Sequence, residues 1–253
     1  MTMNRIEHNK RESRSILIAI AIMLSLIIMN TMLSLAAVPE GPSITYYSNT
    51  SRIVENATLR EGDDKGTITT ISLDSLQQNQ RWKAYVGNVS GMLTLQDADG
   101  YAIYDWTLNT SIVGNVYASR NGTINWGDIN CSTEAHIISE TTFLNHVATA
   151  DDTINATFNS TNHAPFYAAD LLMEECRFTP TYVNDTPQPQ DPTAAFPQML
   201  LSDMGSGSII YTTRIGNANM SYNENLFFDF QLLVPESGTI GVNVNYYFYI
   251  ELQ

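Results

Sequence analysis

The segment Ile16–Ala37 constrains this chain most, because it runs for 22 residues without a charged side chain. A helix of about 20 apolar residues is long enough to cross the hydrocarbon core of a bilayer. Its eleven isoleucine and leucine residues each favour insertion by roughly 0.5 kcal/mol, which outweighs the single Asn30. Basic residues that flank such a helix stay in the cytoplasm, so we predict that everything after Pro39 lies outside the cell. The basic residues before the segment are Arg5, Lys10, Arg11 and Arg14.

Two outcomes for this segment stay open. It ends in small residues at signal-peptidase spacing, Ser34–Ala37, and Pro39 then stops the helix. Against cleavage, the apolar run is longer than the roughly 7–15 residues of a typical signal peptide. The sequence thus predicts a basic cytoplasmic tail over residues 1–15, a signal peptide or transmembrane anchor over 16–37, and an extracellular domain over 38–253.

The predicted extracellular domain is strongly acidic. The chain has 12 basic and 26 acidic residues, of which four basic and two acidic residues lie before Ile16. The remaining eight basic and 24 acidic residues give the rest of the chain a net charge of −16. Nucleic acids and anionic lipid surfaces bind to clustered cations. This charge therefore argues against both as partners of the domain, and it keeps crowded copies soluble.

Cys131 and Cys176 are the two cysteines of the chain, and both lie on the predicted outer side, where the environment is oxidising. Joining them would stabilise the domain by about 4 kcal/mol on the chain-entropy estimate. His136 and His146 follow Cys131 and raise the alternative of a zinc site. Their spacing does not match a zinc signature. We therefore predict a disulfide between Cys131 and Cys176.

Ten Asn-X-Ser/Thr sequons indicate N-linked glycosylation. A glycan is bulky and solvating, so each occupied site has to lie on a loop or an outward-facing strand position. Such a coat argues against a broad open substrate-binding face and favours a shielded structural or display role. The sequon asparagines are Asn49, Asn56, Asn88, Asn109, Asn121, Asn130, Asn155, Asn159, Asn184 and Asn219.

Short runs of alternating apolar and polar residues after Gly66 predict an all-β fold, an antiparallel β-sandwich with a short helix. The interval of about ten residues between strand starts is typical of a sandwich. Pro39–Ser51 is expected to form a stalk or a first strand, with Ser43–Tyr47 as its apolar part. The other predicted strands are Thr67–Leu73, Arg81–Val89, Met92–Gln96, Ala102–Leu108, Ile112–Ala118, Asp151–Phe158 and Phe166–Met173.

The second half of the domain carries three further patterns. Thr133–Val147 has apolar residues at helical spacing and is predicted as the short helix. Phe178–Pro197 contains five prolines, which cannot donate to a sheet, and is predicted as an exposed loop. Leu226–Val234 and Ile240–Leu252 alternate strictly on either side of a turn, and we expect them to pair as a long antiparallel hairpin.

Residues for catalysis or metal binding are sparse. The histidines His136, His146 and His163 stand in no nucleophile–base motif, so we predict that the chain is not an enzyme and holds no cofactor. Gly205–Ser208 resembles a glycine-rich loop but lacks a P-loop lysine, and a flexible turn is favoured. Asp97 and Asp99 have the spacing at which a calcium loop begins, without its remaining ligands. A solvated acidic turn is favoured there, and calcium remains the alternative.

The tryptophans raise the alternative of a carbohydrate-binding surface, because aromatic side chains can stack on sugar rings. Trp82 and Trp106 lie within predicted strands, where a place in the core is expected. Trp126 precedes the predicted disulfide. We favour the core for it as well, and keep it as the candidate for a sugar platform.

A basic tail, one apolar helix and an acidic, sequon-rich β domain resemble the surface glycoproteins of archaea, including subunits of their extracellular filaments. Three tracts, Gly114–Arg120, Ile124–Cys131 and Tyr246–Leu252, resemble secreted proteins of small-genome archaea. Resemblance to type-IV-like pilins would imply assembly through the apolar helix after a processing cut. The chain departs from that pattern, because Ser15 stands where glycine or alanine is usual and Pro39 ends the helix early. Filament families that donate a strand to the next subunit would use a segment such as Ser43–Tyr47.

These observations together lead us to expect a structural or adhesive extracellular glycoprotein, secreted or anchored through Ile16–Ala37. The expected partner is a further copy of the chain, in a filament or a surface layer. The alternative is a membrane-tethered module that binds a glycan or another ligand, with calcium as its possible cofactor.

Overall fold

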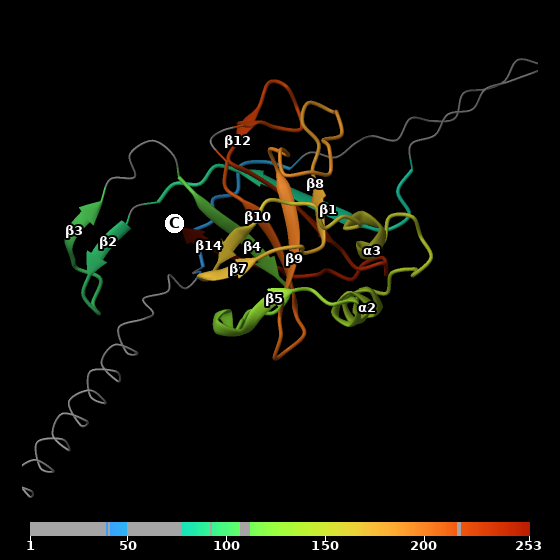
Figure 1. Ribbon diagram of the computed structural model, residues 1–253, viewed down its shortest axis with the longest axis horizontal. Helices are drawn as coiled ribbons and strands as arrows, with labels where there is room; N and C mark the ends of the chain where they lie inside the picture. The colour runs from blue at the N-terminus through green and yellow to red at the C-terminus, as the bar shows by residue number, and fades with distance from the viewer. Residues whose placement is uncertain (1–38, 40, 50–76, 92, 107–111, 217–218) are drawn as a thin grey trace, which may run out of the picture. The chain divides into compact units, whose positions relative to one another are not determined.

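The computed structural model describes residues 39, 41–49, 77–91, 93–106, 112–216 and 219–253. All of these belong to the second of two compact units, Val38–Gln253. The predicted apolar helix Ile16–Ala37, the predicted strand Thr67–Leu73 and the sequons at Asn56 and Asn109 lie outside the described residues. Antiparallel strands with few helices make up the described part, which confirms the all-β class (Figure 1).

The largest element is a six-stranded sheet with the order β14-β4-β10-β9-β5, in which β8 also pairs with β9. Every pair in this sheet is antiparallel. Figure 1 shows β4, β10 and β9 side by side at its centre. The strands are β4 (Gly114–Ser119), β5 (Ile129–Cys131), β8 (Phe178–Pro180), β9 (Pro197–Asp203), β10 (Ile209–Arg214) and β14 (Tyr247–Leu252).

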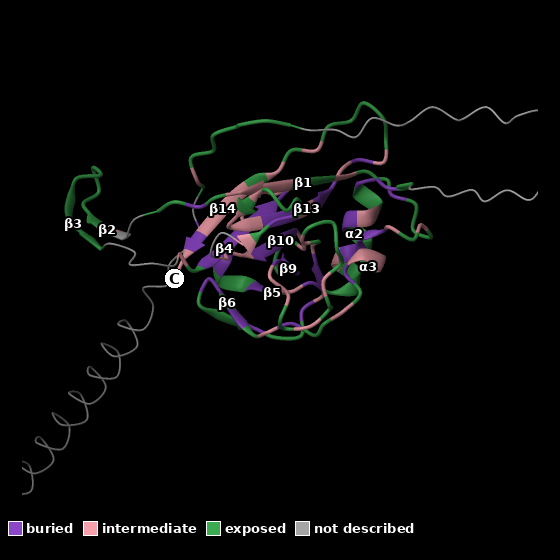
Figure 2. Cartoon of the chain, turned by 90° about the horizontal axis from the view of Figure 1, so that it is seen from above, coloured by how far each residue is buried: buried purple, intermediate pink, exposed green. Residues whose placement is uncertain are grey.

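Both faces of this central sheet are buried. Tyr117 and Ala118 are neighbours in β4, so they point to opposite faces, and neither is exposed. Tyr117 packs in a cluster with Trp126 from the 3₁₀ helix η1 (Trp126–Asp128). Ala118 packs in a second cluster with Leu232 of β13 (Phe230–Pro235). Strands β9 and β10 therefore read as nearly continuous buried runs in Figure 2, without an exposed face.

A second, two-stranded sheet packs on one of these faces. Strand β1 (Trp82–Gly87) pairs antiparallel with β13, from Trp82 opposite Pro235 to Gly87 opposite Phe230. The backbone of Leu233 in β13 is also held by the side chain of Gln198 in β9. The Leu233 N–H donates to Gln198 Oε1 at 2.8 Å, and Gln198 Nε2 donates to the Leu233 carbonyl at 2.5 Å.

Two α-helices cover the same face. Helix α2 (Glu134–Phe143) confirms the helix predicted within Thr133–Val147, and the side chain of Thr133 accepts a hydrogen bond from the first turn. Helix α3 (Ile154–Thr157) shows that the predicted strand Asp151–Phe158 was wrong. Ile154 and Phe158 are four residues apart and both fully buried, which is the spacing of one helix face.

The expected C-terminal hairpin is wrong as well. Strand β13 pairs with β1, whereas β14 pairs with β4 on the central sheet. The intervening residues Thr239–Tyr246 form no strand. The alternating pattern therefore located β13 and the second half of the Ile240–Leu252 run, and it assigned them the wrong partners, because a strand with one apolar face fits either sheet.

Three further pairs of strands are short. The first hairpin is exposed along the whole of β3, including Trp106, which is 49% exposed and not in the core as predicted (Figure 2). The pairs are β2 (Leu93–Gln96) with β3 (Ala102–Trp106), β6 (Phe166–Ala168) with β7 (Leu171–Met173), and β11 (Asn219–Met220) with β12 (Phe227–Phe228).

Two other predictions need correction. The proline-rich tract Phe178–Pro197 is not wholly a loop, because Phe178–Pro180 forms β8 and pairs with Pro197–Met199 of β9. Its prolines are accommodated because Pro180 and Pro197 face each other at the end of that pairing. The segment Ser43–Tyr47 forms no strand within the described part of the chain.

Candidate functional site

The structure contains the predicted disulfide between Cys131 and Cys176, whose Cα atoms are 4.8 Å apart. Cys131 is the last residue of β5, and Cys176 lies just before β8. Both of these strands pair with β9, so the disulfide joins two neighbours of one central strand. The disulfide thereby fixes the short strands at one edge of the central sheet.

Two of the three histidines singled out above, His146 and His163, are bound to backbone groups. His163 Nδ1 lies 2.8 Å from the Ala164 carbonyl, and its Nε2 accepts a hydrogen bond from the Cys176 N–H at 2.9 Å. This pattern requires a neutral ring that donates through Nδ1. His146 Nε2 lies 2.7 Å from the Glu236 carbonyl. Among the residues that the structure describes, no group of three His, Cys, Asp or Glu side chains is placed to hold a metal ion.

The sequon asparagines of the described ranges lie at the surface. Two of the eight, Asn121 and Asn219, are half-buried, and the other six are exposed. None occupies a core position, as glycan attachment requires. The exposed six are Asn49, Asn88, Asn130, Asn155, Asn159 and Asn184.

The predicted turn Gly205–Ser208 joins β9 to β10 and is held by Asp203. The Oδ1 atom of Asp203 accepts from the backbone N–H groups of Gly205 and Ser206, at 3.0 and 3.3 Å. Its Oδ2 atom accepts from the Ser206 hydroxyl at 2.9 Å and from the Asn125 N–H at 3.3 Å. Burial raises the pKa of this carboxyl, but the four hydrogen bonds outweigh burial and hold the pKa below its ordinary value.

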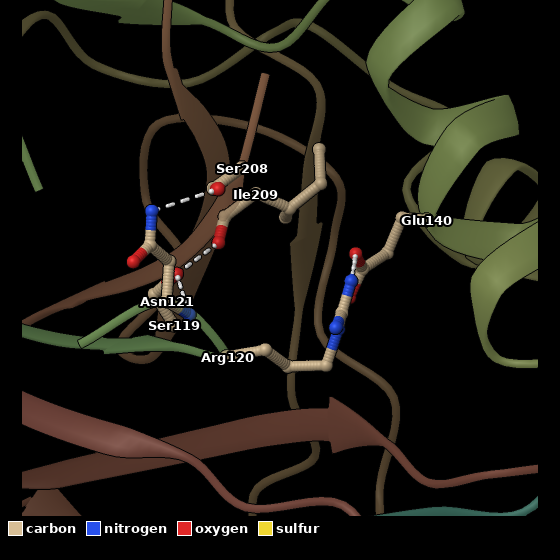
Figure 3. A pocket seen from close by; sticks show the side chains of 6 residues that line it. All are labelled: Ser119, Arg120, Asn121, Glu140, Ser208 and Ile209. Carbon is tan, nitrogen blue, oxygen red and sulfur yellow. Dashed lines mark hydrogen bonds and ion pairs between the residues drawn. The ribbon is translucent and has the colours of Figure 1, made fainter. Parts of the chain in front are cut away.

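A pocket of about 90 Å³ opens beside this turn. Figure 3 shows Asn121 and Ser208 on one side of it, and an ion pair between Arg120 and Glu140 on the other. Arg120 follows β4, Glu140 lies on α2, and Ser208 precedes β10, so three separate elements form the walls. The lining residues are Ser119, Arg120, Asn121, Glu140, Ser208 and Ile209.

The ion pair is well defined and largely buried. Arg120 Nε donates to Glu140 Oε1 at 2.7 Å, and Nη2 donates to Oε2 at 2.5 Å, in a fork-to-fork arrangement. The guanidinium carbon also lies 3.6 Å from the centre of the Phe143 ring. Burial lowers the pKa of Arg120, but the hydrogen bonds and charge of Glu140 outweigh it and raise the pKa. Sequence reasoning missed this pair, since nothing in the spacing of Arg120 and Glu140 signals it.

Of the tryptophans expected in the core, Trp126 is buried and Trp106 is exposed. Trp126 is 8% exposed and packs against Tyr117 and Tyr249, with ring centres 5.0 and 5.2 Å away. It is therefore a core residue, as favoured above, and not a sugar platform. The exposed aromatic pair is Tyr104 and Trp106 of β3, whose ring centres are 5.0 Å apart.

The acidic turn of the same hairpin is held by hydrogen bonds from its own backbone. Asp97 Oδ1 accepts from the backbone N–H groups of Asp99 and Tyr101, at 3.0 and 2.9 Å. This is a side-chain-stabilised turn of the kind that aspartate favours. The carboxylate of Asp97 thus has a structural role between β2 and β3.

Strand β14 forms one edge of the central sheet. Among the described residues it pairs with β4 alone. A Cβ atom on Gly41 would lie 4.0 Å from the carbonyl oxygen of Phe248, which places the N-terminal segment 41–49 beside this strand at Gly41. That segment exposes three large apolar side chains, Ile44 at 67%, Tyr46 at 73% and Tyr47 at 90%. An edge strand with unpaired backbone groups is a template for pairing with a further strand.

Within the described part of the chain, no helix is long and apolar enough to span a membrane. Compared with known proteins, the chain matches no family model, no curated protein and no solved structure.

Proposed function

We propose that this chain is a non-enzymatic extracellular glycoprotein that assembles with further copies of itself into a surface filament or layer. In this proposal residues 16–37 direct the chain to the membrane, as a signal peptide or an anchor, and residues 38–253 form the assembling domain. The two packed sheets, β1–β13 and the central sheet, serve as the layers of a β-sandwich.

One observation carries the proposal: an edge strand and a segment suited to pair with it occur in the same chain. Strand β14 pairs on one side only within the described residues. The segment Gly41–Asn49 forms no strand of its own and exposes Ile44, Tyr46 and Tyr47. Strand addition gains affinity from main-chain hydrogen bonds, and specificity from alternate side chains that enter pockets. The segment of one copy would then extend the central sheet of the next copy beyond β14.

The acidic, sequon-rich surface supports the same proposal. The six exposed sequon asparagines belong to loops and short elements outside β14. None of the six lies on β14 itself, where the proposal places the pairing between copies. A net charge of −14 for the whole chain keeps free subunits apart in solution. Assembly would then depend on strand pairing at β14 and not on non-specific association between subunit surfaces.

Deleting Val38–Ser51 tests the proposal. The deletion removes the donated segment and leaves the described sheets intact, so we expect a folded monomer that cannot polymerise. Assembly is measured by light scattering and electron microscopy of the purified domain, and folding is measured by circular dichroism. The control is a variant of full length in which Ser43 is changed to alanine, which should assemble. Fibres or sheets formed equally well by the deletion variant would refute strand addition.

A second candidate is a module that binds a glycan or other ligand. The exposed aromatic side chains of the β2–β3 hairpin favour it, because Tyr101, Tyr104 and Trp106 are 75%, 60% and 49% exposed. Exposed aromatic clusters often mark binding surfaces. Glycan-array binding that is lost on changing Trp106 to alanine would support this function. Its calcium-dependent form would also require that chelation abolishes binding.

A further inference from the structure

Asn121 is the sequon asparagine that lines the pocket beside the β9–β10 turn. Its Oδ1 accepts from the Thr123 N–H at 2.9 Å, and its Nδ2 donates to the Ser208 hydroxyl at 3.1 Å. An amide nitrogen carries two hydrogens, and the bond to Ser208 uses one. A saccharide replaces one of the two hydrogens, so the glycosylated amide keeps one N–H to donate and keeps its Oδ1 as an acceptor.

The walls of the pocket suit a group rich in hydroxyls. A cavity of about 90 Å³ has room for several water-sized groups, since one such group needs roughly 10–15 Å³. Arg120 directs Nε and Nη2 to Glu140, and its Nη1 has no hydrogen-bond partner among the described residues. Glu140 and Ser208 add acceptor sites. The walls of the pocket therefore offer both donors and acceptors to the hydroxyl groups of a saccharide.

One exposed aromatic ring lies against the sequon, and a second lies against Arg120. Tyr247 lies directly against Gly122, because a Cβ atom on that glycine would lie 3.0 Å from the Tyr247 ring. Tyr247 is 52% exposed, and Phe143, beneath the Arg120 guanidinium, is 66% exposed. The C–H face of a saccharide can cover such rings, which would otherwise remain exposed apolar surface.

We propose that the saccharide attached to Asn121 folds back into this pocket, where its hydroxyl groups bind Arg120, Glu140 and Ser208 and its ring covers Tyr247. The inference rests on the proposed function, because it requires that the chain is glycosylated. The bound saccharide would connect the end of β4, the β9–β10 turn and helix α2, and so stabilise the domain.

In the attachment reaction, a saccharide is transferred to Asn121 from a lipid-linked saccharide phosphate. The Nδ2–C1 bond forms and the bond between C1 and the phosphate oxygen breaks. The phosphate leaves with the bonding electrons, and the displaced amide proton balances its charge. The chain contributes the acceptor amide and the docking surface.

The experiment compares Thr123→Ala with Thr123→Ser in protein recovered from a host that glycosylates it. Thr123→Ala destroys the sequon, whereas serine preserves it, and both keep the backbone N–H that holds Asn121 Oδ1. Thr161→Ala removes the sequon at the exposed Asn159 and controls for the loss of a glycan that points into solvent. Peptide mass spectrometry measures the occupancy of each site, and thermal unfolding measures stability.

We expect Asn121 to be occupied, and Thr123→Ala to lower the unfolding midpoint by about 2–4 °C relative to Thr123→Ser. Thr161→Ala should leave the midpoint unchanged, and the two Thr123 variants should unfold alike when made without glycosylation. An unoccupied Asn121 in a chain that carries glycans elsewhere would overturn the inference and leave the proposed function standing. Occupancy without a difference between the Thr123 variants would also overturn it. A chain without any glycan would refute both.

Discussion

At the scale of single residues, hydrogen bonds from three buried residues hold the buried carboxylate of Glu251. Its oxygens accept from the Ala169 N–H at 3.1 and 3.2 Å, from Asn115 Nδ2 at 3.2 Å, and from the Tyr117 hydroxyl. Glu251 lies on β14 and Ala169 in the β6–β7 turn, so this network attaches the edge strand to the rest of the domain. Burial, and then the charge of Glu251, raise the pKa of Tyr117 well above its ordinary value, so its hydroxyl stays a donor.

We predict that Glu251→Gln destabilises the domain by about 1–3 kcal/mol, the cost of a buried donor left without an acceptor. The added amide group is itself a donor, and it would face the donors that the carboxylate now accepts from. The free energy of unfolding in urea measures the effect. Glu224→Gln is the matched control, because Glu224 is exposed and should change stability little. Equal stability of the two variants would contradict the role given to Glu251.

Asp203 makes stability depend on pH in the acid range. Its hydrogen bonds hold the folded-state pKa below the ordinary value of 3.8. The stabilisation is therefore complete above that value and is lost as the pH falls through the lowered pKa. Asp203→Asn should cost stability at pH 6, and the gap to the wild type should narrow by pH 2. Urea unfolding at both pH values measures the difference in unfolding free energy between the wild type and the variant. A difference that is the same at pH 6 and pH 2 would contradict a lowered pKa for Asp203.

Trp126 and Trp106 allow the effect of removing a buried tryptophan to be compared with that of removing an exposed one. Trp126→Ala should destabilise by about 3–5 kcal/mol, because it removes a buried aromatic side chain. Trp106→Ala should change stability by less than about 0.5 kcal/mol, because its ring is half exposed on a hairpin. Thermal unfolding of both variants measures these losses of stability. A comparable loss in the two variants would mean that the hairpin belongs to the folded core.

At the scale of elements, the sequence predicted β1 and, within Ile112–Ala118, the fully buried β4, but it missed two strands at the centre of the same sheet. Strand β1 alternates and was predicted, whereas β9 (Pro197–Asp203) and β10 (Ile209–Arg214) were not, although they lie at the centre of the fold. Both of their faces are covered, so their side chains do not alternate between apolar and polar. Polar side chains such as Thr212 and Thr213 are also buried there, which further hides the pattern.

Pairing between elements was equally hard to read. Strands β13 and β14 were recognised, but each pairs with a strand more than 100 residues earlier in the chain, β1 and β4. No local signal distinguishes these partners from a hairpin. The disulfide could be predicted because two cysteines allow one pairing. The Arg120–Glu140 pocket could not, since it exists only once β4, α2 and the β9–β10 turn come together.

At the scale of the whole molecule, the account depends on whether one copy extends the sheet of another. The described surface is acidic, with five basic residues, and four of these are in ion pairs with Glu134, Glu140 or Glu236. Complementary charge thus contributes little to self-association. Main-chain pairing at β14, with the apolar side chains of the segment 41–49, has to supply the affinity.

The most direct measurement is a cross-link between copies. The chain has no free cysteine, so an introduced thiol is unique. One variant carries Thr45→Cys in the donated segment, and a second carries Tyr247→Cys at the start of β14. Mixed under mild oxidation, they should form a covalent dimer that contains one copy of each, because paired strands bring such positions within disulfide range. Covalent dimers of two copies of the same variant in place of the mixed dimer, or no covalent dimer at all, would contradict assembly by strand addition.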